Sequence, residues 1–253
     1  MIEFCSLGSG SRGNALLVRT TNTCVLVDCG FGLREFERRL DRSGMHPRDI
    51  DAILVTHEHS DHIGGVAALA RRHDYRVHAT SGTARAAGFD GLRVEVLLAE
   101  RRERIGDIDV LPVTVPHDAR EPCQFVLGSG GRTLGVLTDL GCVTQLVRSC
   151  YSVCDALLLE SNHDSEMLAN GAYPRALKQR VAGPYGHLSN TQAAQLLSGV
   201  ERGALQHVVA GHLSEQNNAA EVARVALGTV LSGSDAQLHL ADQGFGSGWL
   251  RIE

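Results

Sequence analysis

The sequence predicts an α/β (α+β) protein. Short segments rich in aliphatic and β-branched residues alternate along the chain with segments of helical periodicity. Several of the apolar segments end directly at an aspartate or a histidine. Because the ends of neighbouring strands lie side by side at one edge of a sheet, we expect these polar side chains to converge there. The chain contains no linker and no low-complexity tract, so we expect a single domain over residues 1–253.

In the first part of the chain, the sequence predicts a β-hairpin, a helix, a strand and a second helix, over residues 15–18 with 24–27, 33–40, 51–55 and 65–72. The polar turn TTNT joins the two strands of the hairpin. Phe36 and Leu40 are four apart, which places them on one face of the first helix. The strand after that helix is apolar throughout and leads directly into a histidine-rich stretch.

In the second part, the predicted strands and helices cover residues 132–138, 155–159, 191–200, 205–210 and 219–230. The first of these strands ends at Asp139, and the last ends at Gly211 and His212. The helix over residues 191–200 is expected to be capped by Ser189 or Asn190, because short polar side chains satisfy the free N–H groups of a first turn.

The composition fits an ordinary soluble protein of the cytoplasm. Hydrophobic residues make up 43% and charged residues 21%, and no apolar run is long enough to cross a bilayer. The N-terminus has no basic segment followed by an apolar core, so we expect neither a signal peptide nor a membrane partner. The 7 cysteines are scattered without a CxxC pair, which disfavours a disulfide framework or a cysteine-bound zinc. A net charge of −5 disfavours a protein that coats nucleic acid, but it is compatible with an enzyme that has a local basic groove.

Residues 54–65 read LVTHEHSDHIGG and concentrate groups that bind metal ions. Imidazole and carboxylate side chains suit zinc, manganese or iron, among which the sequence does not decide. His57 and His59 follow a strand and can hold one ion, whereas Asp61 and His62 can serve a second ion nearby. A solvated histidine-rich loop is the alternative, but it does not account for this spacing between an apolar strand and a Gly-Gly turn.

HEHSDH resembles the HxHxDH signature of the metallo-β-lactamase fold, a four-layer αββα sandwich with a dinuclear metal site at one edge. Four further residues occur in the order that the family has, namely Asp28 in LVDCG, His117 in TVPHDA, Asp139 in VLTDLG and His212 in AGHLSEQNN. The resemblance implies a first divalent ion on His57, His59 and His117. It implies a second on Asp61, His62 and His212, with Asp139 bridging the two. Asp28 would accept a hydrogen bond from a ligand imidazole.

Three other segments, SGSRGN, ESNHD and GHLSN, resemble the YycJ/WalJ-type proteins of the nuclease-like branch, which are distantly related to ribonucleases Z and J. The resemblance implies a 5′-to-3′ DNA exonuclease of the bacterial cytoplasm, in which metal-bound hydroxide attacks the phosphodiester. DNA would be its partner, and no obligate protein partner is evident. Asp61 and His187 would be the catalytic residues, with His187 assisting at the scissile phosphate.

The residues around His187 also suggest where a phosphate would bind. His187 precedes a predicted helix, whose free N–H groups and positive end attract anions. Lys178 and Arg180 lie just upstream and can add charge-assisted hydrogen bonds. The candidate substrate-binding residues are therefore His163, Lys178, Arg180, Ser189 and Asn190.

Three alternatives remain open from the sequence. The same metal centre can hydrolyse a small molecule, such as a cyclic phosphodiester or a thioester. A non-enzymatic metal-binding scaffold is another possible class of function, although none of the expected metal ligands is missing from the sequence. Arg34, Arg38 and Arg42 are four apart on the first predicted helix and form either a basic stripe for a nucleic-acid backbone or a solvated face.

Overall fold

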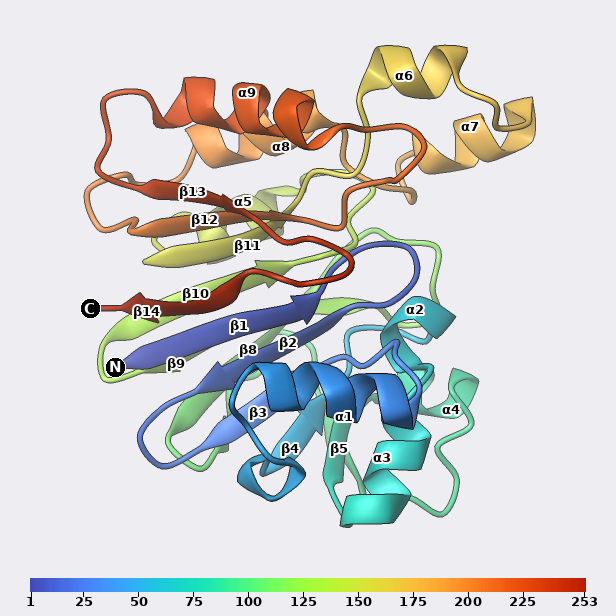
Figure 1. Ribbon diagram of the computed structural model, residues 1–253, viewed down its shortest axis with the longest axis vertical. Helices are drawn as coiled ribbons and strands as arrows, with labels where there is room; N and C mark the ends of the chain where they lie inside the picture. Colours follow the sequence, from blue (N-terminus) through green and yellow to red (C-terminus); the bar gives the residue numbers. More distant parts are fainter.

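The computed structural model describes residues 1–253 and contains two seven-stranded β-sheets that pack face to face, with helices on their outer sides (Figure 1). The strands of the first sheet are β1 (Ile2–Gly8), β2 (Ala15–Arg19), β3 (Cys24–Val27), β4 (Ala52–Leu54), β5 (Arg76–Thr80), β6 (Val94–Leu97) and β14 (Gly248–Ile252). They lie in the order β14-β1-β2-β3-β4-β5-β6. The C-terminal strand therefore closes the edge of the N-terminal sheet.

The second sheet also has seven strands. Its strands are β7 (Glu103–Ile105), β8 (Ile108–Thr114), β9 (Cys123–Ser129), β10 (Arg132–Leu137), β11 (Ala156–Glu160), β12 (His207–Gly211) and β13 (Gln237–Leu240). They lie in the order β13-β12-β11-β10-β9-β8-β7. The run from β10 to β13 is parallel, as is the run from β3 to β6 in the first sheet.

Helices cover the outer face of each sheet. On the first sheet they are α1 (Leu33–Arg42), α2 (Ser60–Ile63), α3 (Val66–His73) and α4 (Ser81–Ala86), with a short 3₁₀ turn at Pro47–Asp49. On the second sheet they are α5 (Gln145–Tyr151), α8 (Asn190–Ser198) and α9 (Ala220–Leu231). The helices α6 (Ser165–Asn170) and α7 (Arg175–Val181) form an arm beyond the sandwich, at the upper right of Figure 1. None of the helices is both long and apolar enough to span a membrane.

Burial on both faces explains why the strand segments read as continuous apolar runs. Every residue of β3, β4 and β11 is buried, because the inner face meets the other sheet and the outer face meets helices. Phe4, Leu54 and Phe125 belong to the core between the sheets. Separate cores lie between each sheet and its helices. The four-layer αββα sandwich expected from the sequence is confirmed.

The elements predicted from the sequence are present with small shifts at their ends. The hairpin of β2 and β3 has Leu16 opposite Val27. Ser189 caps α8, where its side chain accepts a hydrogen bond from the backbone N–H of Gln192. The strand predicted over residues 51–55 ends at Leu54, so the histidines that follow lie on irregular backbone rather than in the sheet.

Candidate metal centre

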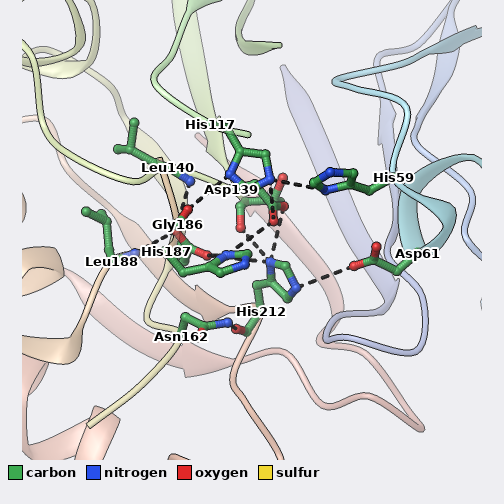
Figure 2. A network of polar contacts seen from close by, with 12 residues as sticks. His59, Asp61, His117, Asp139, Leu140, Asn162, Gly186, His187, Leu188 and His212 are labelled. Atoms are coloured by element: carbon green, nitrogen blue, oxygen red, sulfur yellow. Dashed lines mark hydrogen bonds and ion pairs between the residues drawn. The ribbon is translucent and has the colours of Figure 1, made fainter. Parts of the chain in front are cut away.

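Three histidines meet at the carboxyl edge of the parallel strands. His57 and His59 follow β4, and His117 lies in the loop between β8 and β9. Nδ1 of His59 is 3.0 Å from Nε2 of His57 and 3.2 Å from Nε2 of His117. Three imidazole nitrogens at this separation can hold one metal ion. Figure 2 shows His59 and His117 pointing toward Asp139.

A second group lies beside the first. Asp61 and His62 belong to α2, and His212 follows β12 on the other sheet. Oδ2 of Asp61 is 3.4 Å from Nε2 of His62 and 3.6 Å from Nε2 of His212. Asp139, which follows β10, lies between the groups: its Oδ2 is 2.9 Å from Nε2 of His62 and its Oδ1 is 3.7 Å from Nε2 of His117.

The second ring nitrogen of each histidine is held by the protein. Nδ1 of His62 donates to Oδ2 of Asp28 at 2.7 Å, and Nδ1 of His117 donates to the carbonyl of Gly186 at 3.0 Å. The remaining donations are His57 Nδ1 to Thr56 Oγ1 (2.9 Å), His59 Nε2 to the Asp118 carbonyl (3.2 Å) and His212 Nδ1 to the Thr138 carbonyl (2.7 Å). When these five rings are neutral, as metal binding requires, each therefore has one nitrogen without a proton, and that nitrogen faces the centre.

The electrostatics of the two groups differ. Burial lowers the pKa of His57 and brings that of His117 to about 4, so both rings are neutral near pH 7. Burial also disfavours the charged form of His212, but the carboxylate of Asp139 outweighs it and raises that pKa to about 9. The pKa of His62 is raised for the same reason. The carboxylates beside His62 and His212 therefore need a positive charge nearby. When no metal cation is bound, protonation of these two histidines supplies it.

The residues fit two divalent cations. Oδ2 of Asp139 is buried and accepts no hydrogen bond when His62 is neutral, which is costly for a carboxylate oxygen unless it faces a cation. The donors are imidazoles and carboxylates without thiolate, a set that suits zinc, manganese or iron. Every side chain expected from the sequence to bind metal belongs to one of these groups.

The backbone around the centre adopts uncommon conformations. Asp28 and His212 have positive φ angles of 58° and 52°, although neither is glycine. A Cβ atom on Gly30 would lie 2.0 Å from the carbonyl oxygen of Asp61, so only glycine allows the loop after β3 to approach α2 this closely. The fold therefore holds the ligands at the cost of local strain.

We expect Asp28→Asn to weaken metal binding by about 10-fold to 100-fold, as loss of a partner behind a ligand histidine commonly does. Asparagine can still accept the hydrogen bond from the backbone N–H of Thr56. Its amide NH₂ would then face Nδ1 of His62, whose N–H could no longer donate. Titration with a metal-binding indicator dye measures the change. Asp90→Asn, at an exposed position, serves as the control, and equal affinities of the two variants would contradict the role of Asp28.

Glu160, to which we assigned no role from the sequence, lies beside the centre. It is the last residue of β11 and is fully buried. Its Oε1 is 2.7 Å from Nδ1 of His187, and its Oε2 accepts the backbone N–H groups of Leu140 and Leu188. Burial disfavours a charged His187, but the carboxylate of Glu160 outweighs it and raises the pKa of this histidine. The sequence feature that could have pointed to Glu160 is an acidic residue at the end of an otherwise apolar segment, ALLLE.

A cavity of about 380 Å³ opens onto the metal centre. Its walls include Ser11 of the loop after β1, Tyr173 and Arg180 of the arm, and His187. Arg180 pairs with the carboxylate of Asp118. A larger cavity of about 1070 Å³ lies at the other end of β12, but no metal-binding cluster adjoins it.

The other four candidate substrate residues do not line the cavity at the metal centre. Ser189 caps α8, and the buried side chain of Asn190 forms hydrogen bonds with Ser161 and Asn218. His163 is buried at 2% exposure, and Nζ of Lys178 donates to the carbonyl of Ala169. The structure thus brings only Arg180 of this set to the place where a substrate can enter.

Comparisons with known proteins agree with this geometry. The sequence profile described as "Metallo-beta-lactamase superfamily" matches residues 8–186. Exodeoxyribonuclease YycJ of Bacillus anthracis is 34% identical over 252 residues, which cover 98% of this chain and 92% of that protein. Exodeoxyribonuclease WalJ of Streptococcus pneumoniae is 33% identical over 240 residues, which cover 92% and 89%. The crystal structure of Zn²⁺-bound PqqB from Methylobacterium extorquens has the same fold, with a TM-score of 0.77 at 15% identity over 99% of this chain and 100% of that one.

Proposed function

The chain belongs to the metallo-β-lactamase superfamily and is a metal-dependent hydrolase, and we propose that it degrades DNA exonucleolytically from the 5′ end. The observation that carries the proposal is the similarity, over nearly the whole of both chains, to two proteins named exodeoxyribonucleases. The sequence resemblance to the YycJ/WalJ type is thereby confirmed, whereas the substrate and the direction of cleavage belong to the proposal.

In this proposal the two groups of ligands hold two divalent ions, zinc or manganese, with Asp139 between them. The bound ions would supply a water of lowered pKa as nucleophile and positive charge to stabilise the transition state. Asp61, which lines the cavity, would bind one ion and orient the attacking group. The proposal places the scissile phosphate against Asp61, His187 and Arg180, which share this cavity.

Glu160 and His187 would form the proton-donating pair. Because Nδ1 of His187 faces Glu160, its Nε2 remains available to the cavity. The raised pKa of His187 increases the protonated fraction of the ring near neutrality, and in the protonated ring Nε2–H can donate a proton to the leaving oxygen. Arg180 can exchange its contact with Asp118 for a phosphate oxygen, because both are anionic partners of the guanidinium.

An activity matrix of metals against substrates tests the proposal. Zinc-, manganese- and iron-loaded protein would be assayed on end-labelled single- and double-stranded DNA and RNA, a chromogenic phosphodiester and a thioester. We expect release of nucleotides from the 5′ end of DNA with at least one metal. Thioester hydrolysis without nuclease activity would overturn the proposal in favour of a small-molecule hydrolase, and RNA cleavage without DNA cleavage would correct its substrate.

A further inference from the structure

Two aromatic side chains stand out from the rest of the chain by their exposure. The sequence contains 6 Phe, 4 Tyr and 1 Trp. Only Phe245, at 80%, and Tyr185, at 61%, are exposed, and the others are buried or half-buried. Both lie on the edge that carries the metal centre. The loop of Tyr185 hydrogen-bonds to the loop that bears His117, and the loop of Phe245 hydrogen-bonds to the loop after β1. An aromatic ring with this exposure buries little apolar surface against its own fold.

Hydrogen bonds and a close backbone contact fix the conformation of the loop that presents Phe245. Between β13 and β14, Oδ1 of Asp242 accepts the backbone N–H groups of Gly244 and Phe245 at 2.6 and 2.8 Å. Gly246 closes the turn with a φ of 73°, and a Cβ atom there would strike the carbonyl of Ser6. The turn therefore presents the ring to solvent.

This turn is also fixed relative to the metal centre. Oε1 of Gln243 accepts the backbone N–H of Arg12 at 2.9 Å, and its Nε2 donates to the carbonyl of Gly13 at 2.8 Å. The two loops lie side by side in Figure 1. Ser11, in the same loop as Arg12 and Gly13, lines the cavity at the metal centre. Phe245 thus lies two residues from a side chain that is hydrogen-bonded to a loop of the cavity wall.

Cationic side chains accompany Phe245. The guanidinium of Arg42 lies over its ring at 5.3 Å from the centroid. Arg34 and Arg38 continue along the exposed side of α1 from Arg42, and Arg12, which pairs with Glu215, is 70% exposed. An exposed ring with a guanidinium over one face suits a ligand that alternates aromatic faces with negative charges.

Tyr185 occupies an equivalent place on the arm side of the cavity. Its carbonyl accepts the backbone N–H of Asp118 at 3.0 Å, next to the ligand His117. The following residue, Gly186, lines the cavity, and its carbonyl accepts Nδ1–H of His117. Gly141 packs against the backbone of Pro184 and Tyr185 so closely that a Cβ atom would not fit. Tyr185 is therefore anchored to the metal centre through backbone contacts.

We propose that Phe245 and Tyr185 are base-stacking platforms that bind single-stranded nucleic acid on the two sides of the metal centre. The inference rests on the proposed function and names the form of its substrate. Stacking on an aromatic ring tolerates any base, as a nuclease without sequence preference requires. It also favours single strands, because both faces of a base inside a duplex are already stacked on neighbouring bases. A protein partner would require a contiguous apolar patch, whereas these are isolated rings next to charged residues.

Binding to two oligonucleotides tests the platforms independently of cleavage. One is a short thymidine oligonucleotide and the other has the same length but lacks bases, and both carry phosphorothioate linkages that resist hydrolysis. We expect the holoenzyme to bind the thymidine strand about tenfold or more tightly than the abasic strand in fluorescence anisotropy. Phe245→Ala and Tyr185→Ala should each weaken binding of the thymidine strand by about tenfold while leaving the abasic strand within about twofold.

Two further variants make the result specific. Phe245→Trp retains a stacking surface and should restore the affinity for thymidine, and Val225→Ala, at an exposed apolar position on α9, should change neither affinity. The inference is overturned if the wild type binds both strands equally, or if Phe245→Ala changes only the oligomeric state. Because this assay needs no cleavage, failure of the proposed nuclease activity would be recognised separately, in the metal-by-substrate matrix.

Discussion

Asp139→Asn is expected to lower the metal content from two ions per chain to at most one and to reduce phosphodiester hydrolysis at least about a thousandfold. Asp139 is the only carboxylate whose oxygens face both groups of ligands, with Oδ1 toward His117 and Oδ2 toward His62. Asparagine would offer one oxygen and one amide NH₂, and NH₂ does not bind cations. One ion would then lose a ligand, and both ions would lose the negative charge of this carboxylate.

The electrostatic surroundings make this carboxylate difficult to replace. Burial would raise the pKa of Asp139, but the imidazoles of His212 and His62 outweigh burial and hold its pKa well below the ordinary range. Asp139 therefore carries its negative charge at every pH at which the protein is assayed. No neighbouring carboxylate replaces Asp139 as a metal ligand, because Glu160 already accepts hydrogen bonds from two backbone N–H groups and from His187.

Elemental analysis of purified protein, followed by titration with each metal, measures the number of ions bound. Asp155→Asn is the matched control, since Asp155 is also a buried carboxylate but lies at the opposite end of β11, where it accepts Arg132 and the N–H of Thr133. The control should keep both ions, whatever its effect on thermal stability. Two tightly bound ions in Asp139→Asn would show that Asp139 is not the bridging ligand.

The elements nearest the metal centre were the easiest to predict from the sequence. Strands such as β4 and β11 are buried on both faces, so they appear as unbroken apolar runs that turn residues delimit. Polar ligands come directly after these runs, because the edge of a buried sheet is the first place where the chain can present them. HEHSDH therefore marked the strand end at which the candidate metal ligands gather.

Other features left no local signal. β14 pairs with β1 through contacts such as Ile2 with Ile252, and nothing in either segment identifies its partner. Ser189 illustrates a different limit: its type and position predicted a helix cap correctly, but the same hydroxyl cannot then serve freely as a substrate contact. Glu160 was missed because an acid at a strand end looks the same whether it faces solvent or a buried histidine.

The second large effect is expected at the Glu160–His187 pair. His187→Ala should reduce turnover of DNA by about 10²-fold to 10⁴-fold, the contribution of a positioned general acid, while both metal ions remain bound. The reason is the leaving group: the oxygen released from DNA is a strongly basic alkoxide, which needs a proton as the P–O bond breaks. His187 faces the cavity and touches the centre through Asp139, whose Oδ1 is 3.4 Å from its Nδ1.

Glu160→Gln should produce a smaller loss in the same direction. Its remaining carbonyl oxygen can still accept the backbone N–H groups of Leu140 and Leu188, but the amide NH₂ would face Nδ1–H of His187. His187 would then lose both its orientation and the carboxylate that raises its pKa, so that less of it is protonated near neutrality. The loss should therefore grow as the pH rises.

A comparison of leaving groups separates proton donation from a structural role. Bis(p-nitrophenyl) phosphate releases a phenolate that leaves without a proton, so His187→Ala should retain most of its turnover on this substrate while losing activity on DNA. His207→Ala, a histidine at the other end of β12, serves as the control and should lose neither activity. Equal losses on both substrates would assign His187 to holding the metal centre together, and full activity on DNA would remove it from the reaction.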